Sequence, residues 1–296
     1  MRIFGLLAIV FFLASCSGNK AQEENIEQAL DDAAAAENTV DTEAINAVLQ
    51  QIPSPLEISL MLRESGLEYN EQMLNPTSNE SKYNTNFQKA MNLGVYGTDL
   101  GYTNIYKQNQ DGIGYVSVIR SLADDLSIGQ FFDIETISHL ATNSQNLDSL
   151  LLITTQNFNS INGYLQEQNR SNMSVLLLLG GWLEAMNITC QVAMNAPNDA
   201  LTEAIGEQKI VAESMKLLLD LYESDPTMAE IRETMSPLWD EFDKVTFTVT
   251  EGEKTSEVVD GVLMIVDNST STVNISDETL AAITDLVTEI RNKVIQ

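Results

Sequence analysis

The sequence predicts an all-α protein, a multi-helix bundle with a small β-hairpin insert near residues 245–266. Through most of the chain after residue 45, apolar residues recur at spacings of three and four, which is typical of helices with one buried face. Short motifs that contain proline or glycine separate these stretches. One stretch near the C-terminus alternates apolar and hydroxyl residues instead, which favours strands.

In the first half of the chain, helical spacing predicts three stretches, at 56–74, 87–106 and 116–126. Asn75-Pro76, Asp111-Gly112 and Gly129 are expected to end them, because these residues favour turns. A fourth helix is expected from Ile134 to about Gln168, with Asp133 as its N-cap.

The stretch from Met173 to Met194 is apolar on nearly every face, which places it at the centre of the bundle. Two further helices are expected at 200–222 and 227–244, the second of them opened by Asp225-Pro226. Ser276 opens the final helix, whose apolar stripe consists of Leu280, Ile283, Leu286, Val287 and Ile290.

The exception to helical spacing lies between residues 245 and 266. The run 245–250 alternates apolar residues with threonine, and the run 262–266 is short and rich in β-branched residues. Gly252 and Gly261 lie between them. The two runs predict a β-hairpin inserted between two helices.

Composition excludes several functional classes. The 296 residues include 15 Lys and Arg against 43 Asp and Glu, so the formal net charge is −28 at pH 7. Such a surface repels phosphate backbones, and nucleic acid is therefore not an expected partner. One His and two Cys are too few soft ligands for a zinc cluster.

The N-terminus has the anatomy of an export signal. Arg2 is followed by an apolar run from Ile3 to Leu13, and the segment ends in Leu13-Ala14-Ser15-Cys16. These four residues resemble the lipobox of bacterial lipoproteins, and the resemblance covers residues 1–16 only. It implies cleavage before Cys16, acylation of Cys16 with palmitate-type chains, and anchoring in the bacterial cell envelope, at the outer membrane. The alternatives are an ordinary signal peptide or an uncleaved anchor.

Three regions follow from this organisation. Residues 1–15 are the expected signal peptide, and residues 16–44 are the lipidated Cys16 and a flexible acidic tether with few large apolar residues. Residues 45–296 are the expected helical domain. No later segment is expected to span a membrane, because the longest apolar run, 175–183, is too short.

Two parts of the chain resemble one another. Leu93-Gly-Val-Tyr96 and Leu179-Gly-Gly-Trp182 place glycine and an aromatic residue at an offset of 180 − 94 = 86. Two similar three-helix units and a chance likeness between apolar helices both explain this pattern. In either case the glycines weaken their helices, so close approach of another helix or of a ligand is expected to compensate.

No catalytic pattern stands out in the sequence. His139 is the only imidazole, so the Glu-x-x-His pairs of a di-iron bundle cannot form twice. Cys190 lies in an apolar stretch without cationic neighbours, which indicates a small buried residue. The protein is therefore not expected to be an enzyme, and the covalent lipid is the only expected cofactor.

The most distinctive side chains belong to the glycine-rich and tyrosine-rich helix 93–106. Tyr96, Asp99, Tyr102 and Tyr106, together with Trp182, are candidate binding residues. They could line a groove for a small molecule or a partner helix, or the tyrosines could cover the edge of the core.

The expected function is a non-enzymatic protein-binding or assembly role of a membrane-anchored envelope lipoprotein. An anchor, a spacer and a helical body without a catalytic set favour this interpretation. The partners would be the membrane, through the acyl chains, and an envelope protein. The alternative is a small-molecule-binding lipoprotein that uses the groove beside helix 93–106. An enzyme built on carboxylates alone is a third hypothesis.

Overall fold

The structure is a computed structural model that describes residues 62, 66–133, 135, 147–252, 255–259, 262–266 and 268–296. The predictions for the signal peptide, Cys16, the tether and His139 fall outside these residues. The same holds for most of the stretch 56–65 and for the expected start of the helix after Asp133.

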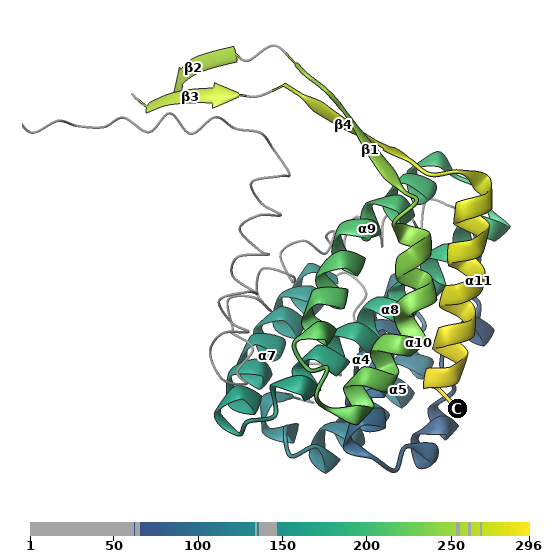
Figure 1. Cartoon of the computed structure of the whole chain (residues 1–296). Helices are drawn as coiled ribbons and strands as arrows, with labels where there is room; N and C mark the ends of the chain where they lie inside the picture. Colours follow the sequence, from purple (N-terminus) through teal and green to yellow (C-terminus); the bar gives the residue numbers. More distant parts are fainter. Residues whose placement is uncertain are drawn as a thin grey trace, which may run out of the picture.

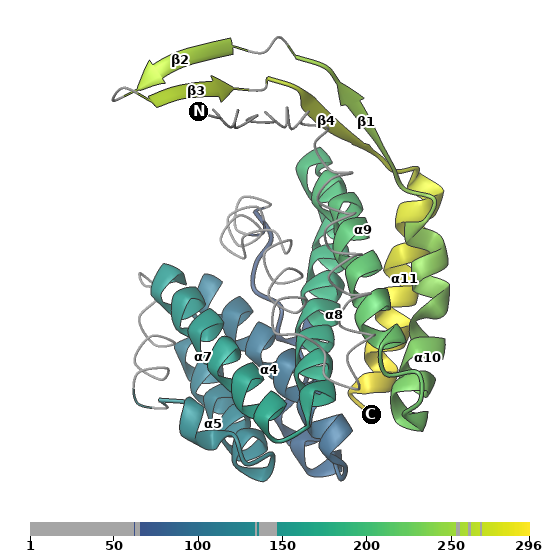
Figure 2. The same ribbon diagram turned by 60° about the vertical axis from the view of Figure 1, so that its left-hand side comes forward.

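The fold is a multi-helix bundle around helix α8, as the sequence predicts. Helices α4, α5 and α7 lie on one side of α8, and α9, α10 and α11 lie on the other (Figures 1 and 2). The α-helices are α4 Asn86–Ile105, α5 Asn109–Asp125, α7 Leu147–Glu167, α8 Ser171–Asn195, α9 Asp199–Asp220, α10 Pro226–Phe242 and α11 Asp277–Val294. The 3-10 helices are η1 Glu71–Met73, η2 Thr77–Lys82 and η3 Gly129–Phe131.

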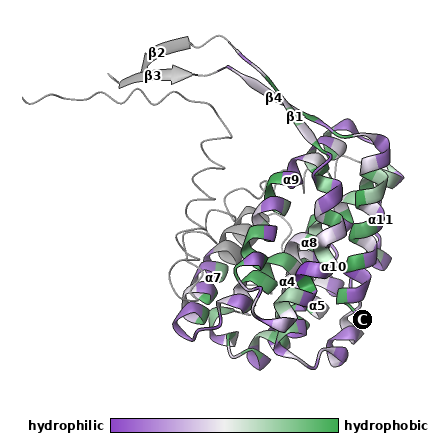
Figure 3. Cartoon of the chain, viewed as in Figure 1, coloured by the Kyte–Doolittle hydropathy of each residue, from purple (hydrophilic) through white to green (hydrophobic). Residues whose placement is uncertain are grey.

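Helix α8 is the core of the bundle. It contacts α4, α7, α9 and α11, and most of its residues are buried. Among the described helices it is the one long and apolar enough to cross a membrane, but most of its apolar window is buried inside the protein. In contrast, green and purple alternate along α9, α10 and α11 in Figure 3, because each has one buried face.

Side chains cap several helices where the sequence predicts a start. Asp225 accepts hydrogen bonds from the N–H groups of Thr227 and Met228 at the start of α10 (2.9 and 3.4 Å). Ser276 accepts one from the N–H of Thr279 at the start of α11 (3.1 Å). These caps satisfy backbone donors that would otherwise lack partners.

The predicted end of the helix through Tyr106 is wrong. Helix α4 ends at Ile105, and α5 already begins at Asn109, so Asp111 and Gly112 lie inside the first turns of α5. The chain reverses at Lys107, whose φ of 60° is left-handed, and the N–H of Gln108 donates to the carbonyl of Thr103 (2.8 Å). A lysine in this conformation carries no sequence signal.

Helices α4 and α8 pack closely at their glycines. A Cβ atom on Gly94 would overlap the carbonyl oxygen of Leu177, and one on Gly180 would overlap that of Met91. The two clashes are reciprocal, because one residue number offset relates Gly94 to Gly180 and Met91 to Leu177: 180 − 94 = 177 − 91 = 86. The close approach expected from the sequence is therefore confirmed at Gly94 and Gly180, and a local two-fold relation joins them.

The β insert is present, but its strands pair differently from the prediction. Strand β1 (Thr246–Thr250) pairs antiparallel with β4 (Thr270–Asn274), and β2 (Thr255–Val259) pairs antiparallel with β3 (Val262–Val266). The runs 245–250 and 262–266 are thus not partners. The segments that do pair with them, TSEVV and TSTVN, are polar enough to look like loops in the sequence. We call the four strands the arm.

Candidate functional site

The tyrosines of α4, together with Tyr106 directly after it, bind a segment of the chain itself. The Tyr96 hydroxyl donates to the carbonyl of Pro76 (3.0 Å), and the Tyr106 hydroxyl donates to that of Leu62 (3.2 Å). Tyr102 accepts a hydrogen bond from the N–H of Asn70 (3.4 Å), and its ring lies 5.5 Å from that of Tyr69. The described residues between 62 and 76 therefore lie where the sequence suggested a groove, and the tyrosines attach them to the core.

Trp182 has a separate environment on the other side of α8. Its indole N–H donates to Gln208 Oε1 of α9 (3.0 Å), and its ring lies 5.8 Å from that of Trp239 and 6.2 Å from that of Phe242 in α10. The structure thus brings Tyr96, Tyr102 and Tyr106 together around one segment and places Trp182 elsewhere in the core.

Asp99 belongs to a buried ionic cluster with Glu184 of α8 and Arg291 of α11. Arg291 binds Glu184 with two donors, Nε and Nη2, each 2.7 Å from a carboxylate oxygen. Its Nη2 also donates to the carbonyl of Met73 (3.0 Å). The exposed fractions are 0% for Asp99 and Glu184 and 6% for Arg291. This bidentate pair links helices that are 107 residues apart in sequence.

Asparagines beside the cluster hold the C-terminal end of α11. The Asn92 side chain donates to the carbonyl of Val294 (3.0 Å), and Asn79 donates to that of Ile295 (3.2 Å). Asn75 donates to Asn92 Oδ1 (3.3 Å) and to the Tyr83 hydroxyl (2.9 Å). The last turn of α11 is therefore bound to α4 and to the segment before it.

Burial changes the acid–base properties of this region. Desolvation raises the pKa of Asp99 well above its usual range, and the neighbouring Glu184 raises it further. Burial opposes the charge on Arg291, but its bond to Glu184 and the nearby carboxylates raise its pKa above the usual value. The three side chains are buried, and the ion pair connects α8 with α11.

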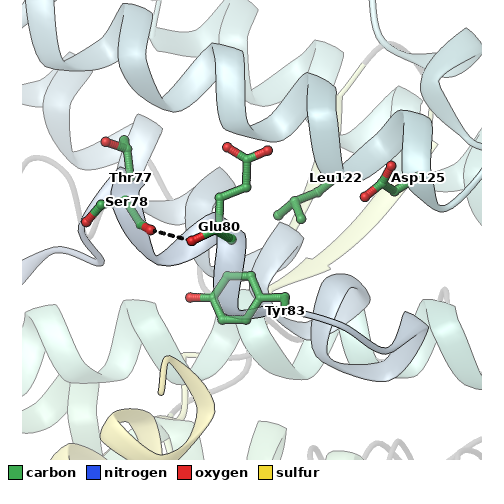
Figure 4. A pocket seen from close by; sticks show the side chains of 7 residues that line it. Thr77, Ser78, Glu80, Tyr83, Leu122 and Asp125 are labelled. Atoms are coloured by element: carbon green, nitrogen blue, oxygen red, sulfur yellow. Dashed lines mark hydrogen bonds between the residues drawn. The ribbon is translucent and has the colours of Figure 1, made fainter.

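The surface has a shallow polar hollow between η2 and the end of α5 (Figure 4). Its volume is about 490 Å³, and it is open to solvent. Its lining includes Glu80 and Asp125, and Lys89 pairs with Asp125 at 2.6 Å. The hollow has neither the apolar walls nor the converging polar groups of a small-molecule site.

Among the described residues, no group of three or more His, Cys, Asp or Glu could hold a metal ion. Comparison with protein-family models, curated proteins and solved structures finds no match to this chain. The arm remains as the feature that is not explained by packing of the body.

The base of the arm is firmly attached to α9. Gly206 of α9 leaves room for Val273 of β4, since a Cβ atom there would overlap the Val273 side chain. Lys209 Nζ donates to the carbonyls of Asp243 and Val245 (3.2 and 2.8 Å), just before β1. Val245 itself is fully buried. The arm is thus held on both sides where it leaves the bundle.

Beyond its base the arm projects away from the helices (Figures 1 and 2). The outgoing strands β1 and β2 together contain ten residues, and so do the returning strands β3 and β4. Ten strand residues correspond to roughly 33 Å at about 3.3 Å per residue. Most residues of β1 and β4 are exposed, and Val249 has an exposed fraction of 59%. Each described strand pairs with one neighbour only, so its outer edge carries backbone groups outside the ladder.

Sequence reasoning missed the ionic cluster and the arm. Glu184 is the only charged residue between Ser171 and Asn195, and a single carboxylate in such an apolar helix is a signal for a buried partner. The identity of that partner, Arg291, carries no local signal. The threonine alternation near residue 246 did indicate a strand, but not a projection.

Proposed function

We propose that this protein is a lipid-anchored envelope protein whose role is to bind another protein through the arm. The lipidation motif at Cys16 supports the location in a bacterial envelope, at the outer membrane. The projecting arm is the observation that supports protein binding. An isolated two-stranded ribbon is only marginally stable in water, so a second chain that covers it contributes stability.

The chemistry of the arm fits a protein partner. Its free strand edges can accept an additional strand, which is a common mode of peptide recognition. The sequence of β3 is apolar at all five positions. Val249 of β1, nearer the base, has an exposed apolar side chain. Backbone hydrogen bonds would supply affinity and side chains would supply specificity. Such a role needs no catalytic residues.

The body offers less to a small molecule. The candidate binding residues Tyr96, Asp99, Tyr102 and Trp182 are buried with partners in the same chain. Ligand capture beside helix 93–106 would require the described residues between 62 and 76 to leave α4. We therefore favour the assembly role over the small-molecule alternative.

The test compares the full chain with an arm-shortened variant in which Asn-Gly replaces residues 251–269. Asn-Gly suits a two-residue hairpin loop, so β1 and β4 can still pair at the base. Each protein is incubated with detergent-solubilised envelopes, and mild cross-linking then fixes the complexes that form. We expect a stoichiometric protein partner with the full chain and its loss with the variant, while both proteins unfold at similar temperatures.

A body-surface variant, Ile113→Ser on α5, is the control, because Ile113 is exposed at 49% and distant in sequence from the arm. It should retain the partner. Equal recovery of the partner by the arm-shortened protein would contradict the role of the arm. Release of a small molecule from the denatured protein, without a protein partner, would favour ligand capture instead.

A further inference from the structure

The buried cluster of Asp99, Glu184 and Arg291 is unbalanced in charge. If both acids were ionised, two carboxylates would share one guanidinium in a buried site. Burial of an uncompensated charge is costly, and proteins usually neutralise such a group by a change of protonation. One of the two acids is therefore expected to carry a proton.

Arg291 donates all of its described hydrogen bonds to groups other than Asp99. Nε donates to Glu184, and Nη2 donates both to Glu184 and to the carbonyl of Met73. Nη1 lies 3.5 Å from Asn292 Oδ1. Glu184 is therefore the ionised member of the pair, because it receives the bidentate, charge-assisted contact.

Only one of the two carboxylate oxygens of Asp99 accepts a hydrogen bond among the described residues. Its Oδ2 accepts a hydrogen bond from the N–H of Asn75 (3.1 Å), while its Oδ1 is buried and accepts none. Asp99 and Glu184 are both fully buried, and the Glu184 carboxylate is among the groups that raise the pKa of Asp99. Two buried carboxylates that interact in this way repel each other unless one is protonated.

We propose that Asp99 and Glu184 share one buried proton, carried on Asp99 Oδ1 and donated to the Glu184 carboxylate. The cluster then contains a neutral Asp99, an anionic Glu184 and a cationic Arg291, and its net charge is zero. The proton also gives Oδ1 the hydrogen bond that it otherwise lacks. This inference concerns the body of the protein and is independent of the arm.

The other ionisable groups around Asp99 favour the same state. Tyr96 of the same helix, Tyr83 after η2 and Tyr115 of α5 all lie near it, and burial raises the pKa of each. They are neutral at physiological pH and add no cation that could stabilise an ionised Asp99. Among the described groups, Arg291 is the cation that lowers the pKa of Asp99, and burial and the neighbouring Glu184 raise that pKa by more.

The shared proton acts as a pH-sensitive lock on α11. Through it, Asp99 of α4 and the Asn75 backbone are connected to Glu184 of α8 and so to Arg291 of α11. Loss of the proton at high pH places a second negative charge beside Glu184. We expect this repulsion to loosen the C-terminal turns of α11 before the rest of the bundle unfolds.

The direction of the pH dependence follows from the raised pKa of Asp99. Above its usual value of 3.8, the unfolded chain loses the Asp99 proton while the folded chain keeps it. The contribution of Asp99 to stability is therefore complete below that value and decreases as the pH rises. The decrease stops where folded Asp99 itself ionises.

The test compares wild type with Asp99→Asn in full-length protein, by thermal unfolding across the pH range. Asparagine can accept from Asn75 and donate to Glu184 without a titratable proton. The Tm of the variant relative to wild type should rise by several degrees between about pH 4 and about pH 8. Asp125→Asn, at a half-exposed surface pair with Lys89, is the matched control and should show no such trend.

Two measurements on the folded protein complete the test. Infrared spectra at neutral pH should contain the carbonyl band of a protonated carboxyl group in wild type and lack it in Asp99→Asn. At high pH, amide exchange near Arg291 should be faster in wild type than in the variant. Absence of the band, or a stability difference that is constant with pH, would overturn the proposal. A stability increase on addition of sodium or calcium salts, specific to wild type, would show instead that a cation balances two ionised acids.

Discussion

Individual acidic residues of this chain have opposite roles that depend on burial. Asp124 and Asp125 are adjacent acids at the exposed end of α5, whereas Asp99 and Glu184 are fully buried. The chain has 43 acids, so their residue type alone says little about any one of them. The sequence singled out Asp99 by its tyrosine neighbours, and the structure explains it by its contact with Glu184. The side chain is thus part of the core rather than of a ligand groove.

Cys190 allows a direct test of burial at the residue scale. Its exposed fraction is 0%, and desolvation raises the pKa of its thiol to about 12, against a weaker opposing bond to Thr284. The reactive thiolate is therefore scarce near neutral pH. We expect iodoacetamide to modify Cys190 only after unfolding, as measured by intact mass spectrometry.

The control for this experiment is Val249→Cys on the exposed part of the arm, which should react in the native protein. Equally fast native modification of Cys190 would contradict its place in a closed core. Slow modification of both cysteines would show instead that the arm is covered in solution.

At the scale of elements, the crossing of α4 and α8 organises the bundle. Gly94 and Gly180 allow the two backbones to meet, and Thr98 donates to the carbonyl of Gly181 at the same crossing (3.0 Å). The other glycines of α4 have a different role, because a Cβ atom on Gly97 or Gly101 would meet nothing within 4 Å. The helical cost of these two glycines has no packing explanation in the structure.

Glycine-to-alanine substitutions at the crossing and on the exposed face of α4 are expected to have opposite effects on stability. Gly94→Ala and Gly180→Ala would push a methyl group into a carbonyl of the facing helix, which should destabilise the fold by about 1–3 kcal/mol or more. Gly97→Ala, on the exposed face of α4, should stabilise it by up to about 1 kcal/mol. Urea denaturation measures all three.

A loss of stability in Gly97→Ala comparable to that in Gly94→Ala would show that helix flexibility, and not contact, explains these glycines. If Gly94→Ala and Gly180→Ala cost similar amounts, the local two-fold relation of the crossing gains support. The wider prediction of two similar three-helix units stays a prediction. The helix expected at 56–74 is wrong over residues 66–74, where the structure has only the 3-10 helix η1 and no α-helix.

At the scale of the whole molecule, the arm and the expected lipid anchor define how the protein would work. The arm leaves the bundle between α10 and α11, and its base is fixed by contacts with α9. The anchor would fix the other end of the chain to a membrane. A tether between the two would let the arm reach a partner at some distance from the lipid surface.

The expected lipid anchor predicts that replacing Cys16 changes where the protein is found in the cell. In Cys16→Ser, no acyl chain can attach, and each lost methylene removes about 0.8 kcal/mol of membrane affinity. We expect the protein to move from the membrane fraction to the water-soluble fraction of cells. Cys190→Ala should remain with the membrane, since Cys190 is buried in the bundle.

Mass spectrometry of the mature wild-type protein provides the complementary measurement. It should find an acylated N-terminal cysteine derived from position 16. An unmodified N-terminus at another residue would contradict the envelope assignment, although it would leave the arm as an interaction element.

The sequence alone determined what depends on near neighbours. The spacing of apolar residues gave the helices, and Asp225 and Ser276 gave their starts, because a cap involves residues two or three positions away. The glycines of α4 and α8 indicated a close approach, since their helical cost needs compensation. The threonine alternation after Val245 indicated strands, because alternation is a local property of the pleat.

The tertiary structure alone decided what depends on residues far apart in the chain. Strand β1 pairs with residues 270–274 rather than 262–266, and several arrangements satisfy the same local pattern. Glu184 pairs with Arg291 across 107 residues, and Tyr96 of α4 donates to the carbonyl of Pro76 in the segment before that helix. Burial sets the charge state of Asp99, and burial is a property of the packed bundle, not of the sequence around one residue.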